Sequence, residues 1–222
     1  MKRVDLVHNR LPLALWELRP GQGRALLLLH GLGERTHPGA LEPVEPWPGP
    51  VYGLDFTGHG ASGVPLGGGY YCEVLMGDVD IALAHLDPDS SGDPGVTVAG
   101  RGLGGYVALL IAGARPALVR GAVISDGPGL HGGGPSPSTP VLLRPEQDGS
   151  TPDPVALLEL ATDVRPPDYA RTYAWQASAL SGLDTAIAVT AVNRPPWLAE
   201  VAAQPGVVET DLPSALALFA QA

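Results

Sequence analysis

The chain has 222 residues, of which 45% are hydrophobic and 16% charged, a composition typical of one globular domain rather than of a disordered protein. Asp and Glu outnumber Lys and Arg by 23 to 13, and the net charge of −10 argues against nucleic acid as a partner. The single cysteine, Cys72, excludes an internal disulfide and a cysteine-based zinc site, and no metal or cofactor is predicted.

No apolar signal-peptide core follows the N-terminus. The longest apolar runs, Ala25–Leu29 and Val107–Ala112, are far shorter than the roughly 18 residues that a membrane helix needs. We therefore expect a cytoplasmic protein with no membrane partner. Lys2 is the only lysine, and the abundance of Ala, Gly and Pro is typical of a GC-rich bacterial gene.

Strand and helix patterns alternate along the chain, which predicts an α/β fold with a mostly parallel central sheet of about seven or eight strands flanked by helices. The strands expected in the first half are Val4–Val7, Leu13–Leu18, Ala25–Leu29, Val51–Asp55, Val96–Ala99 and Gly121–Ser125. A helix is predicted from about Cys72 to Leu86, because its apolar residues recur on one face. Tyr106–Ala114 is apolar almost all round, which predicts a buried helix.

The pattern breaks after the sixth strand, where Gly127 to Pro154 is rich in Gly and Pro and predicts a long loop or an excursion from the sheet. Strands and helices then resume. We expect helices at Pro154–Ala161, Asp168–Leu180, Pro196–Ala203 and Pro213–Ala220, and strands at Ala186–Val192 and Val207–Glu209. The whole chain, residues 1–222, is predicted to form a single domain.

Three glycine-containing segments each follow a predicted strand. They are His30–Gly33, Asp55–Ser62 and Gly100–Gly105. The third passes from a strand through a tight glycine turn into a helix. Such a turn places one residue above the carboxyl edge of the sheet and directs helix N-terminal amides at the same point.

In these segments, in their order and nearly from end to end, the chain resembles the α/β-hydrolase superfamily. His30-Gly31 is similar to the family's oxyanion-loop motif, and Asp55–Ser62 to its D-x-x-G-H-G-x-S segment. Gly100–Gly105 lies where the family has its G-x-S-x-G-G nucleophile elbow. The resemblance implies an α/β-hydrolase fold with a small lid-like insertion at about residues 127–182.

The chain departs from the family at its catalytic residues. Gly102 occupies the position of the nucleophile and has no side chain with which to attack. All six histidines lie before residue 132, whereas the family's histidine follows the last strand. Asn193 stands near the usual position of the acid, and Asp126 could be the alternative acid. A triad needs all three roles, so we expect a hydrolase-like pseudoenzyme with a degenerate triad.

The backbone part of the site needs no side-chain chemistry. By the resemblance, the N–H groups of Leu32 and Leu103 take the two oxyanion-hole positions, next to His30, Gly31 and Gly102. We therefore expect a pocket at the carboxyl edge of the sheet for a small carbonyl-containing or anionic ligand, without serine-hydrolase activity.

Two alternatives stay open on the sequence alone. In the first, the protein is a hydrolase or lyase-type enzyme in which Asp126 or His131 acts as a non-standard base beside the backbone oxyanion hole. In the second, Gly100–Gly105 binds a dinucleotide, since it fits G-x-G-x-x-G and Asp126 follows about 20 residues later, as a ribose-binding acid does.

Overall fold

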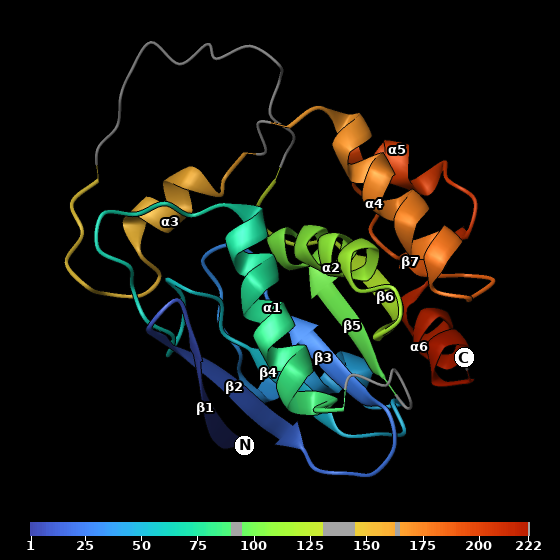
Figure 1. Ribbon diagram of the computed structural model, residues 1–222, viewed down its shortest axis with the longest axis horizontal. Coiled ribbons are helices and arrows are strands. Elements are labelled where there is room, and N and C mark those ends of the chain that lie inside the picture. Colours follow the sequence, from blue (N-terminus) through green and yellow to red (C-terminus); the bar gives the residue numbers. More distant parts are fainter. Residues whose placement is uncertain (90–94, 131–144, 163–164, 222) are drawn as a thin grey trace.

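The computed structural model describes residues 1–89, 95–130, 145–162 and 165–221. These residues form one eight-stranded sheet in the order β1-β2-β4-β3-β5-β6-β7-β8 (Figure 1). The strands are β1 (Lys2–His8), β2 (Leu11–Arg19), β3 (Ala25–Leu29), β4 (Val51–Leu54), β5 (Val96–Arg101), β6 (Val119–Ser125), β7 (Ile187–Val189) and β8 (Val207–Glu209). β2 pairs antiparallel with β1 and β4, and every other pair is parallel. The predicted mostly parallel sheet is confirmed.

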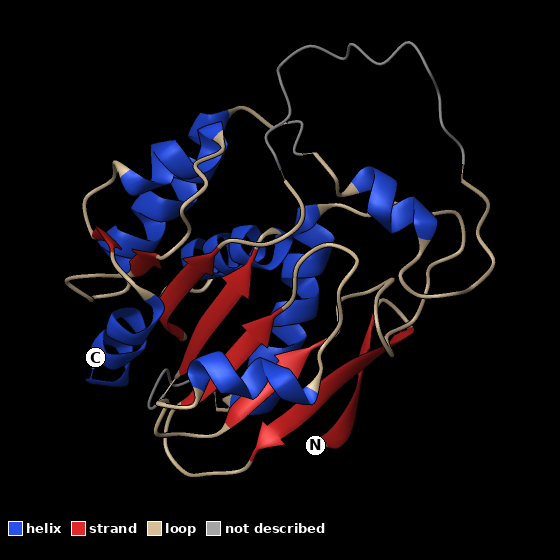
Figure 2. Cartoon of the chain, turned by 180° about the vertical axis from the view of Figure 1, so that it is seen from behind, coloured by secondary structure: helices blue, strands red, loops and turns tan. Residues whose placement is uncertain are grey.

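Helices cover both faces of the sheet. One face carries α1 (Cys72–Leu86), α2 (Leu103–Ala114), α4 (Pro167–Leu180) and α5 (Pro196–Ala202). The other face, seen in Figure 2, carries the short 3₁₀ helix η1 (Pro38–Val44) and α6 (Leu212–Gln221). The predicted helices lie within a few residues of their expected positions. η1 was not predicted, and it proves important for the site.

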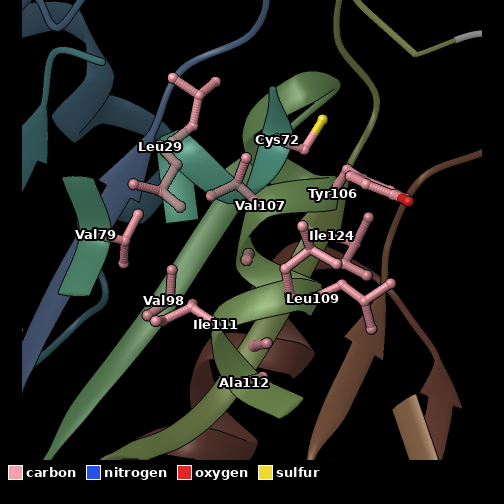
Figure 3. Packing of buried hydrophobic residues seen from close by; sticks show 14 of the residues in the cluster. Leu29, Cys72, Val79, Val98, Tyr106, Val107, Leu109, Ile111, Ala112 and Ile124 are labelled. Carbon is pink, nitrogen blue, oxygen red and sulfur yellow. The ribbon is translucent and has the colours of Figure 1, made fainter. Parts of the chain in front are cut away.

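The core lies mainly between the sheet and α2 (Figure 3). Every residue from Leu103 to Gly113 is buried, because β5 and β6 lie on one side of the helix and α1 and α4 pack against its flanks. An all-round apolar helix is stable in water only when it is covered in this way. Each fully buried Leu or Ile contributes about 1.5–3 kcal/mol through the area removed from water. The prediction of a buried helix is confirmed.

The chain reverses its direction of travel across the sheet at β3. From β3 it passes through η1 on one face to β4, and later returns to β5 on the other side of β3, from which it enters α2 on the opposite face. The connections that leave β3 and β5 therefore diverge. Such a divergence opens a crevice at the carboxyl ends of the two strands, where α/β sheets generally bind ligands.

The segment predicted to be lid-like divides into parts with different surroundings. α3 (Pro154–Glu159) is linked to the loop after β4, since the Tyr70 hydroxyl donates to Asp153 Oδ2 at 2.6 Å. α4 instead packs against α2 and α5 and belongs to the helix layer. Residues 131–144 and 163–164 lie outside the described residues, so the boundaries of the insertion stay a prediction. No helix in the described ranges has the length and apolarity needed to span a membrane.

Candidate functional site

A tight turn joins β5 to α2 at the carboxyl edge of the sheet. Gly102 joins them with φ +53° and ψ −118°, in the left-handed region that favours glycine, and its N–H donates to Ser125 O at 3.0 Å. A Cβ at this position would meet the Gly127 carbonyl oxygen at 2.6 Å and that of Pro128 even closer. The space for a nucleophilic side chain is thus filled by backbone, so glycine is required at 102 by conformation and by contact.

The two amides named from the resemblance converge on one atom. Leu32 N–H and Leu103 N–H both donate to the carbonyl oxygen of Pro128, at 2.9 and 3.0 Å. Leu32 follows β3 and Leu103 begins α2, so two separate loops supply the two donors. This is the geometry that stabilises a developing oxyanion in acyl transfer. Here the oxygen belongs to the chain itself, and it saturates both donors.

The segment that carries this carbonyl is anchored on its C-terminal side. Leu130 N–H donates to Ala161 O at 3.1 Å, and the Trp197 indole N–H donates to Leu130 O at 3.1 Å. The indole is itself buried and packs edge-to-face on Tyr106, with ring centroids 4.8 Å apart. Leu130 is 1% exposed. The Pro128 carbonyl is therefore held in place by contacts with α2, α5 and the end of α3.

Asp126 anchors the other side of the segment. Its carboxylate accepts hydrogen bonds from Val192 N at 2.6 Å and from Asn193 N and Nδ2, both at 3.0 Å. Burial alone would raise the pKa of this carboxyl, but the donors outweigh burial and lower its pKa. Asp126 and Asn193 thus come together to join two loops, and a carboxylate with a lowered pKa is a weak base near neutral pH. His131, the other candidate base, lies outside the described residues.

His30 links the oxyanion loop, residues 30–33, to the loop after β4. Its Nδ1–H donates to Gly31 O at 2.8 Å, while Nε2 accepts from Phe56 N–H at 3.1 Å. One donor and one acceptor make this a neutral imidazole. Burial first, and then the neighbouring His59, lower the pKa of His30 to about 4. The Gly31 N–H is in turn bound by Glu34 Oε2 at 2.9 Å, so both His30 and Gly31 hold the loop that carries Leu32.

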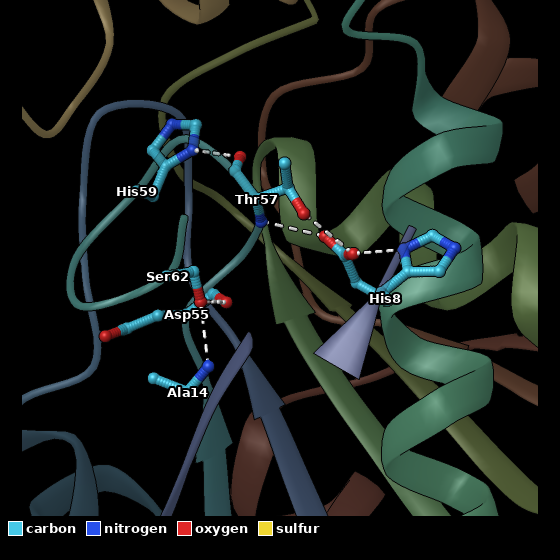
Figure 4. Close-up of polar contacts among 7 residues, drawn as sticks. His8, Ala14, Asp55, Thr57, His59 and Ser62 are labelled. Carbon is cyan, nitrogen blue, oxygen red and sulfur yellow. Dashed lines mark hydrogen bonds and ion pairs between the residues drawn. The ribbon is translucent and has the colours of Figure 1, made fainter. Parts of the chain in front are cut away.

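The Asp55–Ser62 segment also forms a structural network (Figure 4). Asp55 Oδ2 accepts from the Trp16 indole and from Ala61 N–H, both at 2.9 Å. The Ser62 hydroxyl accepts from Ala14 N–H at 2.9 Å. These bonds tie the loop after β4 to β2. Nearby, buried Asp78 accepts from Thr57 N–H at 2.8 Å and pairs with His8 at 2.7 Å.

Two cavities border this carboxyl edge. The smaller, about 50 Å³, adjoins Gly102 and Asp126 on the side of α5. The larger, about 320 Å³, lies between η1 and the ends of β3, β5 and β6. A pocket at this edge of the sheet was expected, but its η1 wall was not, because η1 was not predicted from the sequence. The one available signal was Pro38, since proline is common at the first position of a helix.

No metal site is evident in the described ranges, where no group of three or more His, Cys, Asp or Glu side chains is arranged to hold an ion. The Gly100–Gly105 turn could serve a phosphate only through free amides. The N–H groups of Gly102 and Leu103 instead donate to carbonyl oxygens of the chain. Dinucleotide binding stays a prediction that this geometry does not favour.

Comparison with known proteins identifies the fold. No family model matches the sequence, and no curated protein matches it. Among solved structures, N-formylmaleamic acid deformylase from Pseudomonas putida S16 is similar with a TM-score of 0.65 and 15% identity, over 98% of this chain and 94% of that protein. A bacterial membrane phospholipase A gives a TM-score of 0.56 and 18% identity, over 95% and 78% of the two chains.

Epoxide hydrolase I from potato (Solanum tuberosum) gives a TM-score of 0.50 and 22% identity, over 62% of this chain and 42% of that protein. This chain thus spans nearly the whole deformylase but less than half of the epoxide hydrolase. These likenesses and the sheet order show that the chain has the α/β-hydrolase fold. At such identities they show the fold alone.

Proposed function

We propose that this chain is an α/β-hydrolase-fold protein without serine-hydrolase activity, which binds a small carbonyl-containing or anionic molecule at the carboxyl edge of its sheet. The observation that carries the proposal is the Pro128 carbonyl oxygen, which accepts from both Leu32 N–H and Leu103 N–H. Gly102 supports it, because position 102 has neither a nucleophile nor room for one.

Hydrolysis through this site would require two separate changes. A substrate carbonyl could reach the two amides only after displacing the Pro128 oxygen, and the removal of even one such donor from a serine hydrolase costs about 3 kcal/mol of transition-state stabilisation. A nucleophile would then be needed as well, and the space above Gly102 is filled by the backbone of 127–128. Because the filled site is anchored at Asp126 and Leu130, we assign it a structural role.

The ligand is then expected in the adjacent cavity of about 320 Å³ rather than against the two amides. The cavity opens at the divergence between β3 and β5, the position at which α/β sheets bind small molecules. Its volume is within the range of small-molecule sites, which begin at about 300 Å³.

Turnover of p-nitrophenyl acetate tests the absence of hydrolysis. We expect the wild-type rate to equal that of an inert acidic control protein. Gly102→Ser should not raise this rate and should lower the melting temperature, because its side chain would overlap the backbone of 127–128.

Gly23→Ser is the matched control for stability. Gly23 also has a positive φ, +86°, but a Cβ there has nothing within 4 Å. Its smaller destabilisation therefore measures the conformational part alone, about 1–3 kcal/mol. Wild-type turnover above the control protein, or a Gly102→Ser variant that gains activity at an unchanged melting temperature, would contradict the proposal.

A further inference from the structure

The chemistry of the 320 Å³ cavity indicates which class of ligand it binds, an inference that rests on the proposed function. The apolar floor comes from the sheet and includes Leu28 and Ala99, and the wall formed by η1 adds Ala40 and Val44. The ionisable residues at the cavity come from two places. They are Glu34, Arg35 and His37 in the loop before η1, and His30, Arg101 and Asp126 at or just after the strand ends.

Most of these charges are already satisfied within the protein. Glu34 accepts from Gly31 N–H at 2.9 Å and pairs with Arg101 at 3.3 Å. Asp126 is bound by three donors of residues 192–193. In the part of the chain that the structure describes, Arg35 forms no hydrogen bond and no ion pair. It is the one guanidinium at the cavity whose charge is not already compensated.

The backbone on both sides of Arg35 is fixed. Glu34 N–H donates to Gly31 O at 3.1 Å, and Thr36 N–H donates to Asp55 Oδ1 at 2.7 Å. Asp55 is itself 1% exposed and tied to β2 through the Trp16 indole. The long, exposed side chain of Arg35 is thus attached to a fixed backbone and lines the cavity beside its apolar floor. Such a fixed backbone lowers the ordering cost of binding.

We infer that the cavity binds a monocarboxylate with a short apolar body, whose carboxylate pairs with Arg35 while the body lies on Leu28 and Ala99. A planar carboxylate fits the two-pronged geometry of a guanidinium. The neighbouring carboxylates of Glu34 and Asp126 would repel a doubly charged phosphate more strongly than a single negative charge. A neutral ligand would leave Arg35 unused.

The other large cavity, about 390 Å³ beside His8 and Tyr70, does not share this feature. The imidazole of His8 is already paired with buried Asp78 at 2.7 Å. The anion preference is therefore assigned to the cavity at the carboxyl edge alone.

Calorimetric titration with octanoate tests the inference, with 1-octanol and octylamine as neutral and cationic probes of the same length. We expect octanoate to bind, octanol to bind more weakly and octylamine not to bind. Arg35→Gln should weaken octanoate binding about tenfold or more and leave octanol unchanged. Arg10→Gln, which removes the same charge from the hairpin turn between β1 and β2, should leave both unchanged.

Two variants that fill the cavity test whether octanoate binds there. Ala99→Leu on β5 and Ala40→Leu on η1 fill the cavity from two different elements, and each should abolish octanoate binding. If octanoate and octanol bind equally and both variants block them, the cavity is a binding site but the carboxylate inference is overturned. If octanoate does not bind, or binds regardless of both fillings, the inference is likewise overturned. The ester assay decides the absence of hydrolysis independently of either result.

Discussion

Histidine illustrates how burial decides the role of single residues in this chain. His30 and His59 lie with their ring centroids 5.1 Å apart, both buried and both held by carbonyl oxygens of nearby residues. Burial is the main cause that lowers both pKa values, that of His30 to about 4. In these surroundings an imidazole is neutral at pH 7, and His30 serves as a hydrogen-bonded support for the oxyanion loop.

The lowered pKa predicts how stability depends on pH. The unfolded chain binds a proton at His30 near pH 6.5, whereas the folded chain does so only near pH 4. The stability that neutral His30 contributes to the fold is therefore fully present above pH 6.5. As the pH falls toward 4, this contribution of about 3 kcal/mol to the free energy of unfolding is lost. His8 has the opposite effect on stability. Its hydrogen bond to Asp78 raises its pKa, so the stability that charged His8 contributes is lost as the pH rises.

Urea denaturation between pH 7 and pH 4, with an NMR titration of each histidine, measures these contributions separately. We expect the His30 ring to remain neutral well below pH 6. A His30 midpoint near the ordinary value of about 6.5 would contradict the buried, neutral assignment.

The residues of the site differ in how far the sequence could identify them. The glycine turn at Gly102 followed from a local pattern, strand–glycine–helix, that is readable along the chain, and the positions of the two amides followed from the resemblance to the α/β-hydrolase superfamily. The Pro128 carbonyl did not. Every residue has a carbonyl oxygen, so its identity carries no signal, and the acceptor becomes visible only when three separate loops meet in space. Position 102 could be recognised as lacking a nucleophile, but not as filled by backbone.

At the scale of elements, periodicity predicted nearly all of the sheet and its main helices. The buried strands and α2 are continuous apolar runs, and such runs fit few structures other than a buried strand or a buried helix. η1 was missed because its seven residues include Pro38 and Pro43, which read as a loop. The cavity that η1 closes was missed with it. Short helices of this kind depend on tertiary contacts more than on propensity.

Trp197 on α5 provides a test of how the elements hold the filled site. Trp197→Phe keeps the aromatic packing on Tyr106 but removes the donor to Leu130 O, which leaves a buried acceptor unsatisfied. We expect a loss of about 1–3 kcal/mol in the free energy of unfolding, measured by urea denaturation. Trp175→Phe on α4 is the control, because Trp175 is 59% exposed, and its effect should stay within about 0.5 kcal/mol. Equal effects of the two changes would contradict the anchoring role of the indole.

At the scale of the whole molecule, the fold could be predicted because its three motifs mark chain reversals at one edge of a parallel sheet. Their order and their positions after strands constrain the topology far more than any single motif does. Which part of that edge is open to a ligand could not be predicted from the sequence. In this chain the crevice between β3 and β5 is divided, with one side filled by residues 127–128 and the other left open as the cavity under η1.

The central claim is that the chain's own carbonyl saturates the oxyanion hole, and through-hydrogen-bond NMR couplings measure this directly. In a long-range HNCO spectrum of isotopically labelled protein, we predict correlations from the amides of both Leu32 and Leu103 to the carbonyl carbon of Pro128. Leu26 N–H, which donates to Pro50 O at 2.9 Å, is a matched positive control. If the Leu26 correlation is seen while Leu32 and Leu103 show none and exchange rapidly with solvent, the site is open and the account is wrong.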